Sequence, residues 1–335
     1  MTTPLQAPPL LEVQDLTVRF RTDAGWMTAV DRVSLSVGEG EALGIVGESG
    51  SGKSVTALSI LRLHAAPTTR LPTGKIIYGG RDLLGLPMRD MRAIRGREIA
   101  MIFQDPMSSL NPVLTIADQI GETLRLHQGL DEAAARKRVV ELLDLVRIPD
   151  AARRVDEYPH RLSGGMRQRV MIAIAIACRP KLLIADEPTT ALDVTIQAQI
   201  LDLLRDLQKE LGMSVILITH DMGVIAEFAR RVMVMYAGRV VETAPVSELF
   251  RRPVHPYTDG LLAAIPKLDV DVRRLPAIPG SIPDPTAVIP GCRYSPRCPL
   301  VQAVCRTEAP PLLPAGPERE ARCPPRVAAM QGAPA

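Results

Sequence analysis

The stretch GESGSGKS, from Gly47 to Ser54, constrains the fold of this 335-residue chain more than any other feature. It fits the pattern G-x-x-x-x-G-K-[S/T], follows the apolar run ALGIV, and precedes a segment predicted to be helical from Lys53 to about Leu63. In this order, a strand, a glycine-rich turn and a helix let backbone N–H groups point at phosphate oxygens, and the helix N-terminus adds a favourable dipole. The sequence therefore predicts a phosphate-binding loop.

The residue types of this loop indicate how a nucleotide would be held. Lys53 would neutralise charge on the β- and γ-phosphates, and the hydroxyl of Ser54 would ligate Mg²⁺. The other candidate contacts are Gly47, Ser49, Gly50, Ser51 and Gly52. We therefore expect ATP with Mg²⁺ as the ligand.

Four polar residues lie at or just after apolar segments and are candidates for chemistry at the triphosphate. Asp186 ends KLLIAD and is placed to hold the Mg²⁺ shell, and Glu187 follows it and is placed to orient and polarise an attacking water. His220 ends VILITH and could touch the γ-phosphate and the water. Gln104, in MIFQDP, could reach the metal or the water. These residues predict hydrolysis as well as binding.

The segment LSGGMRQ is a second candidate anion site. Ser163, Gly164 and Gly165 form a serine–glycine turn that leads into an apolar helix, so their N–H groups and hydroxyl form another anion nest. Nothing in the sequence allows one chain to close two such nests around one nucleotide. We therefore expect a second chain to face the first.

The periodicity of the chain predicts an α/β fold. Strand patterns occur at 11–20, 33–37 and 42–46, residues from about 85 to 170 are mostly helical, and strands alternate with helices after Lys181. We predict a P-loop ATPase core at 10–265, with a β-rich N-terminal subdomain and the helical insertion. More than half of the 30 prolines follow Arg251, which predicts a small loop-rich domain at 266–335.

Charge and composition exclude some classes of protein. A net charge of +3 and an aromatic content of 3% argue against a nucleic-acid partner. No segment approaches the roughly 20 apolar residues of a membrane helix, and the N-terminus carries no export signal. We therefore expect a cytosolic chain, in which cysteines are reduced thiols, metal ligands or redox groups.

Taken together, these motifs resemble the ATP-binding cassette (ABC) family in residues and in order, over about residues 10 to 265. Gly47–Ser54 match its Walker A motif, Asp186–Glu187 its Walker B motif and catalytic glutamate, and Ser163–Gly165 the core of its signature. Gln104 matches its Q-loop, Ala191–Asp193 its D-loop with Asp193 at the dimer contact, and His220 its switch histidine. Phe20 lies where the family's adenine-stacking aromatic usually sits, or it is a core strand residue.

The resemblance implies a head-to-tail dimer of cassettes. Each ATP would lie between the Walker A motif of one chain and the signature of the other. Hydrolysis would open this sandwich, and a membrane partner would convert the motion into transport.

A narrower resemblance links DPMSSLNP, HPYTDGLLAAIP and the cysteine-containing tail to ATPase subunits of dipeptide and oligopeptide importers. It implies a peripheral subunit at the cytoplasmic face of the membrane, with two transmembrane permease subunits, an external solute-binding protein and a second ATPase, either identical or a paralogue. Nickel and glutathione importers share much of the pattern. A soluble ABC ATPase without a transport role is a further alternative. Such ATPases usually join two cassettes or carry long coiled-coil insertions, whereas this chain has one cassette and no heptad run.

Four of the five cysteines lie in the tail, with the spacing C-x5-C-x6-C-x17-C: Cys292, Cys298, Cys305 and Cys323. This spacing fits neither common zinc ribbons nor bacterial ferredoxins, so it does not name a metal. Four thiolates around one metal centre could stabilise a small proline-rich unit. The importer resemblance implies an iron–sulfur cluster with four irons. Zinc, free thiols and disulfides are the alternatives, and Cys178 is expected to be a core residue.

Overall fold

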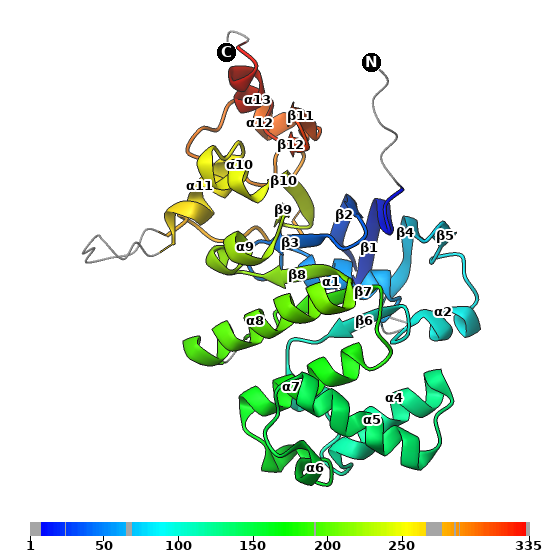
Figure 1. The fold of residues 1–335 in the computed structure, drawn as a ribbon. Helices are drawn as coiled ribbons and strands as arrows, with labels where there is room; N and C mark the ends of the chain where they lie inside the picture. The colour runs from blue at the N-terminus through cyan, green and yellow to red at the C-terminus, as the bar shows by residue number, and fades with distance from the viewer. Residues whose placement is uncertain are drawn as a thin grey trace, which may run out of the picture. The chain divides into compact units, whose positions relative to one another are not determined.

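The computed structural model describes residues 8–23, 25–64, 69–190, 192–265, 277–284, 286–287 and 289–332. The chain divides into two compact units, shown in Figure 1. The first unit contains the chain up to Val37, then 42–84 and everything from Thr219, and the second contains 38–41 and 85–218. Within the described ranges, no helix is both long and apolar enough to cross a bilayer.

An antiparallel sheet begins the first unit. Its strands run in the order β2-β1-β4-β5, with the bounds β1 Leu11–Thr22, β2 Gly25–Val37, β4 Thr69–Tyr78 and β5 Arg81–Asp82. The buried positions of β1 are 11, 13, 16 and 18, so the alternation expected of one buried sheet face shifts by one residue between Val13 and Leu16, where the strand pairing is irregular. The predicted strand at 11–20 is confirmed, and the one at 33–37 is the end of the longer β2.

The same unit contains the strands that carry the phosphate loop. β3 (Ala42–Val46) is fully buried and pairs in parallel with β9 (Arg231–Tyr236), which forms a hairpin with β10 (Arg239–Pro245). A strand buried on both faces reads as a continuous apolar run, which explains ALGIV. The helices of this part are α1 Lys53–Ile60, α9 Met222–Phe228, α10 Val246–Arg251 and α11 Pro256–Ala263.

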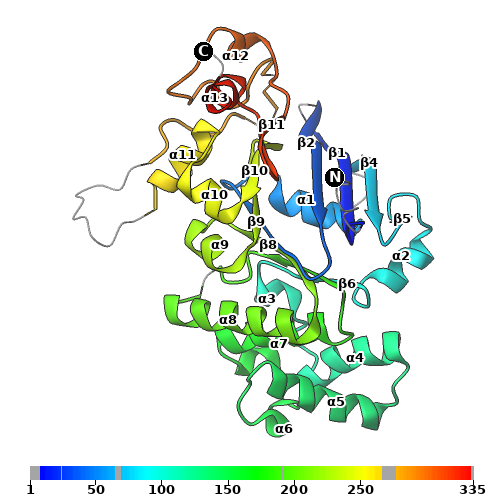
Figure 2. The same ribbon diagram turned by 45° about the horizontal axis from the view of Figure 1, so that its top comes forward.

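The tail also belongs to the first unit and has elements of its own. They are α12 Val304–Thr307, β11 Leu313–Gly316, β12 Arg319–Ala321 and α13 Pro324–Met330, grouped in Figure 2. β12 pairs antiparallel with β10, and a small core of Val254, Ala315, Ala321 and Val327 lies beneath. The tail thus extends the sheet of the β9–β10 hairpin. The predicted domain boundary at 265/266 stays a prediction, because 266–276 lie outside the described residues.

The second unit has three parallel strands in the order β8-β7-β6: β6 Ile99–Ile102, β7 Leu182–Asp186 and β8 Ser214–Thr219. The helices are α2 Met88–Ile94, α3 Pro106–Ser109, α4 Ile116–Gln128, α5 Glu132–Leu145, α6 Ala151–Arg154, α7 Gly164–Ile176 and α8 Val194–Leu211, with a 3₁₀ turn at Pro159–Arg161. Figure 1 shows α4 to α7 gathered together. Helices occupy most of residues 85–170, with the short strand β6 between α2 and α3, and the helical subdomain itself stays a prediction.

Candidate functional site

The phosphate loop connects β3 to α1 within the first unit. Gly47, Gly50 and Gly52 have φ values of +153°, +77° and +98°, which residues with side chains rarely adopt. A Cβ on Gly47 would lie 2.2 Å from the carbonyl oxygen of Met235 on β9. At this position glycine is needed both for the backbone conformation and for the close approach of β9.

The polar side chains of the loop fit a phosphate ligand. Lys53 is 5% exposed, and its Nζ donates to the carbonyl oxygens of Gly47 (2.8 Å) and Glu48 (3.1 Å). Among the described residues, the hydroxyl of Ser51 is buried without a hydrogen-bond partner. A buried hydroxyl of this kind favours a polar ligand in the loop, because an unpaired buried polar atom is costly. Ser54 is the second residue of α1 and is partly exposed.

Two further predicted residues lie in the first unit. His220 is exposed and directly precedes Asp221, which caps α9 by accepting from the N–H of Gly223 at 2.7 Å. Phe20, on β1, is half-buried and meets the ring of His64 edge-on, with 5.5 Å between centroids. Its proposed contact with adenine stays a prediction.

The second unit brings the predicted catalytic carboxylate and the Q-loop glutamine together. Asp186 ends β7 and is 4% exposed, and Glu187 follows it with a φ of +47°. The amide of Gln104 donates to Oε2 of Glu187 at 2.9 Å, and the hydroxyl of Thr190 donates to the same oxygen at 2.9 Å. The sequence analysis missed Thr190, although its position one turn after Glu187 could have indicated this contact.

The serine–glycine turn forms the exposed N-terminus of α7. Ser163 is the N-cap, and its hydroxyl accepts from the N–H of Met166 at 3.3 Å. Ser163 and Gly164 are exposed, whereas Gly165 lies against α8, where an added Cβ would come within 2.8 Å of Ile196. Free N–H groups at the first turn of a 13-residue helix suit an anion.

Asp193 caps α8 in the same way, by accepting from the N–H of Ile196 at 2.9 Å. Asp193 and the following Val194 are exposed, Val194 at 84%. Ala191, the first residue of the predicted D-loop, lies outside the described residues.

Known proteins match this chain along most of its length. The family profile described as "ABC transporter" matches residues 30–190, and "Oligopeptide/dipeptide transporter, C-terminal region" matches residues 241–305. A protein of Brucella abortus (strain 2308), provisionally named a peptide import ATP-binding protein, is 62% identical over 327 residues, 98% of this chain and 98% of that protein. The chain belongs to the ABC transporter ATPase family.

Other members of the family are similar over comparable lengths. A Brucella ovis protein with the same provisional name is 52% identical over 94% of this chain and 96% of its own length. The ATP-binding cassette MJ0796, solved as a dimer in a post-hydrolysis state with ADP and phosphate, is 30% identical with a TM-score of 0.63, over 70% of this chain and 98% of that one. The cbiO1 protein of Clostridium perfringens is 28% identical with a TM-score of 0.61, over 73% of this chain and 92% of its own. This ABC ATPase therefore has the cassette fold and extends beyond it.

The extension of the ABC ATPase contains the four tail cysteines, which are all half-buried and form no disulfide. Burial raises the pKa of Cys292, Cys298 and Cys323, the last to about 11, and charge on the neighbouring cysteines raises each pKa further. Backbone N–H groups donate to these three thiols. In the described part of the chain, no group of three or more His, Cys, Asp or Glu side chains is arranged to hold a metal ion, so the predicted metal-bound domain is not confirmed.

The remaining cysteine, Cys178, is half-buried just beyond the end of α7. Burial raises the pKa of its thiol, while a hydrogen bond with Gln128 acts in the opposite direction. A half-buried thiol at this position fits a residue that packs in the protein rather than one that binds a metal.

Sequence reasoning also missed a group of contacts at the Walker A loop. Glu48 is one of the variable positions of the motif, yet its carboxylate pairs with Arg297 of the tail and its N–H donates to the hydroxyl of Tyr257. The partners are separated by 249 and 209 residues, so no local pattern could have indicated them.

Proposed function

We propose that this ABC ATPase energises the uptake of dipeptides or oligopeptides through two transmembrane permease subunits. The observation that carries the proposal is the whole-length relation to proteins provisionally named for peptide import, together with the matching tail profile at 241–305. Nickel and glutathione importers are the alternative systems. An external solute-binding protein would deliver the solute, and the ATPase would be peripheral at the cytoplasmic face of the membrane.

We assign the parts of ATP hydrolysis to residues of the matched motifs. Lys53 and the loop glycines would bind the β- and γ-phosphates, and Ser54, Asp186 and Gln104 would hold Mg²⁺, which supplies charge neutralisation. Glu187 would orient a water molecule and accept its proton. The water oxygen forms a bond to the γ-phosphorus as the bond to the β–γ bridging oxygen breaks, which leaves ADP and phosphate. The hydrogen bonds of Gln104 and Thr190 to Glu187 support this role because they fix the carboxylate.

A second ATPase would complete each site. Ser163, Gly164 and the D-loop residue Asp193 are exposed, as residues that bind a facing chain and its ATP must be. The cassette MJ0796, solved as a dimer, supports the same arrangement here. The facing chain would be an identical copy or a paralogue.

We also propose that the tail cysteines hold an iron–sulfur cluster with four irons. Two observations support it. The thiols lie near enough to one another for the charge of one to raise the pKa of the next, and backbone N–H groups donate hydrogen bonds to three of them. Thiolates around such a cluster bind different irons, so they stand further apart than the ligands of a single ion. The bound cluster would supply a cross-link, because the free energy of metal binding stabilises the folded tail.

Reconstitution tests the transport function. The ATPase, its permeases and its solute-binding protein would be placed in proteoliposomes with labelled dipeptide, labelled glutathione or nickel. We expect ATP-dependent accumulation of the peptide and none with the Glu187→Gln variant. Accumulation of nickel or glutathione alone would assign the chain to the alternative importers, and ATP hydrolysis without any association with permeases would contradict a transport role.

A further inference from the structure

Arg297, in the tail, is bound on all sides within the first unit. Its side chain is 4% exposed and forms a bidentate ion pair with Glu48, with Nη1–Oε2 and Nη2–Oε1 distances of 2.7 and 3.1 Å. Its other donors reach the carbonyl oxygens of Pro279 (2.9 Å) and Ile278 (3.3 Å) and the hydroxyl of Tyr236 (3.4 Å). These contacts use the five N–H donors of the guanidinium, so its orientation is fixed.

Glu48 transmits this restraint to the Walker A loop. Its N–H donates to the hydroxyl of Tyr257 at 2.9 Å, and its carboxylate is held by Arg297. Its carbonyl oxygen accepts from the Nζ of Lys53 at 3.1 Å and from the N–H of Ser51 at 3.2 Å. A continuous set of hydrogen bonds therefore joins Arg297 to the lysine expected to bind the phosphates.

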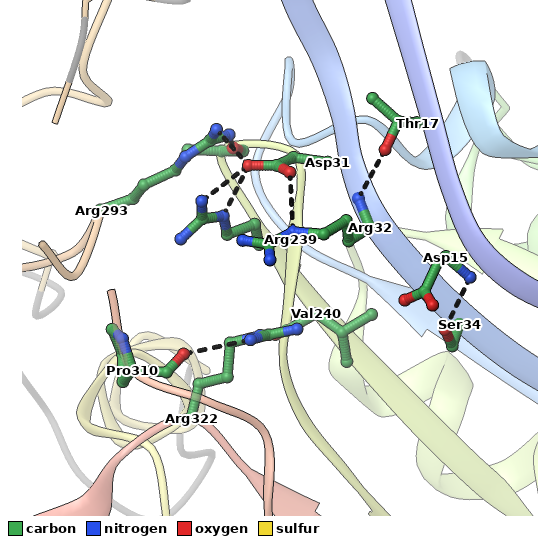
Figure 3. A network of polar contacts seen from close by, with 11 residues as sticks. Asp15, Thr17, Asp31, Arg32, Ser34, Arg239, Val240, Arg293, Pro310 and Arg322 are labelled. Carbon is green, nitrogen blue, oxygen red and sulfur yellow. Dashed lines mark hydrogen bonds and ion pairs between the residues drawn. The ribbon is translucent and has the colours of Figure 1, made fainter. Parts of the chain in front are cut away.

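A second arginine of the same tail segment, Arg293, is also linked to the loop, and Figure 3 shows its ion pair with Asp31. Arg293 pairs with Asp31 at 2.8 Å and donates to the carbonyl oxygen of Ala237. The next residue, Gly238, donates its N–H to the carbonyl oxygen of Ser51 at 2.9 Å. Burial alone would raise the pKa of Asp31, but the hydrogen bond from Arg239 and the charges of the surrounding arginines lower it, so the network stays ionised at neutral pH.

We propose that Arg297 is a positioning residue for the nucleotide site, which holds the Walker A loop and Lys53 in their binding conformation through Glu48. The proposal rests on the assignment of this loop as the ATP site. Arg293 follows Cys292 and Arg297 precedes Cys298, so both arginines come from the short segment 292–298. This segment is linked to the loop at two points, through Glu48 and through Ser51. The extension thereby becomes part of the nucleotide-binding machinery.

Equilibrium binding of ATP to the purified full-length chain tests this role. Arg297→Met and Glu48→Gln should each raise the Kd by about tenfold, and the double variant should be no weaker than either single one, because coupled partners are non-additive. Arg297→Lys keeps the charge but loses the bidentate geometry, so it should restore only part of the affinity. In steady-state hydrolysis, KM should rise more than kcat falls.

Arg326→Met is the matched control. Arg326 also ties the tail to the rest of the first unit, by an ion pair with Asp259 on α11 and a hydrogen bond to the carbonyl oxygen of Pro253, and neither partner belongs to the loop. We expect it to lower the melting temperature and leave the Kd for ATP within about twofold. A Kd that rises equally in Arg326→Met and Glu48→Gln would reduce Arg297 to a general structural contact and overturn the proposal.

The Lys53→Ala variant tests the assignment of the loop as the ATP site separately from the positioning role of Arg297. If it abolishes ATP binding while Arg297→Met and Glu48→Gln bind normally, the site assignment stands and the positioning role fails. If Lys53→Ala binds ATP normally, the loop assignment itself fails. Should Arg297→Met not fold, Glu48→Gln and Arg297→Lys still decide the question, because both preserve most of the packing.

Discussion

At the scale of single residues, both the backbone and the side chain of Glu187 are restrained. Its φ of +47° is unusual for a residue with a long side chain, and Gln104 and Thr190 both donate to the same carboxylate oxygen. Backbone strain that persists in a structure is often found at functional sites.

Replacing Glu187 by glutamine should separate binding from hydrolysis. The amide cannot accept a proton from water, so we expect ATPase activity to fall by at least about 10²–10⁴-fold. The Kd for ATP should stay within a few-fold, because the predicted phosphate contacts lie in the Walker A loop. Single-turnover hydrolysis and equilibrium binding would measure the two effects, and Thr190→Val is a milder companion variant. Hydrolysis at the normal rate in Glu187→Gln would refute the catalytic assignment.

His255 makes the stability of the protein depend on pH. It is fully buried as the N-cap of α11, where Nδ1 accepts from the N–H of Tyr257 at 3.1 Å. Burial, with a smaller contribution from the charge of Arg326, lowers its pKa to about 3. Between that value and the ordinary pKa of 6.5, the unfolded state binds a proton that the folded state does not, so stability falls as the pH falls below 6.5.

His255→Asn should remove this pH dependence while keeping a side chain that can cap the helix. Between about pH 7 and pH 5.5, wild-type protein should lose about 1 kcal/mol more unfolding free energy than the variant does. Denaturant unfolding at both pH values gives the comparison, and all other titrating groups are shared by the two proteins. Equal losses would show that His255 is protonated in the folded state.

At the scale of elements, the strand β12 is fixed to β10 by a buried ion pair. Glu242 is 0% exposed and its carboxylate accepts from Arg319 at 2.9 Å and from the N–H groups of Val254 and His255. Arg319 also donates to the carbonyl oxygen of Arg252. The N–H groups of Val254 and His255 reach both carboxylate oxygens, and Arg319 of the tail adds the positive charge that pairs with the buried carboxylate.

Arg319→Met should detach this strand, because it leaves Glu242 buried and unpaired. We expect a loss of about 3–5 kcal/mol of unfolding free energy. Adding Glu242→Gln should recover part of that loss, since the neutral amide tolerates burial better. Hydrogen exchange at β10 would show whether the loss is local, and an unchanged exchange pattern in Arg319→Met would exclude this role for the pair.

The elements also show how far local sequence predicts this fold. ALGIV and KLLIAD were recognisable as strands because β3 and β7 are buried along their whole length. β12 has only three residues, two of them charged, and exists because β10 offers it a partner. The motifs assigned Gln104 and Glu187 to the same chemistry without predicting the hydrogen bond between them, and the ion pair between Glu48 and Arg297 depends on the folded tail. What sequence could not supply was long-range pairing without a local pattern.

At the scale of the whole molecule, the proposed iron–sulfur cluster can be tested through the metal content of the protein. Anaerobically purified protein should contain about four irons and four acid-labile sulfides per chain, with a matching visible spectrum. Cys298→Ser, or removal of iron with a chelator, should abolish the spectrum and lower the melting temperature, because metal binding contributes to folding. One zinc and no sulfide would instead identify a zinc site and would weaken the peptide-importer assignment. Cys178→Ser, outside the tail, is the matched control.

The pairing of β12 with β10 also bears on how the protein is made. β10 ends at Pro245 and its neighbour β12 begins only at Arg319, so β10 leaves the ribosome well before its partner. During the several seconds needed to translate the intervening chain, the outer edge of β10 has no strand to pair with. Unpaired edges recruit other chains, so the nascent polypeptide is most prone to aggregation in this interval. Chains that stop before Arg319 lack β12 altogether, so they should give a much lower soluble yield than the full chain.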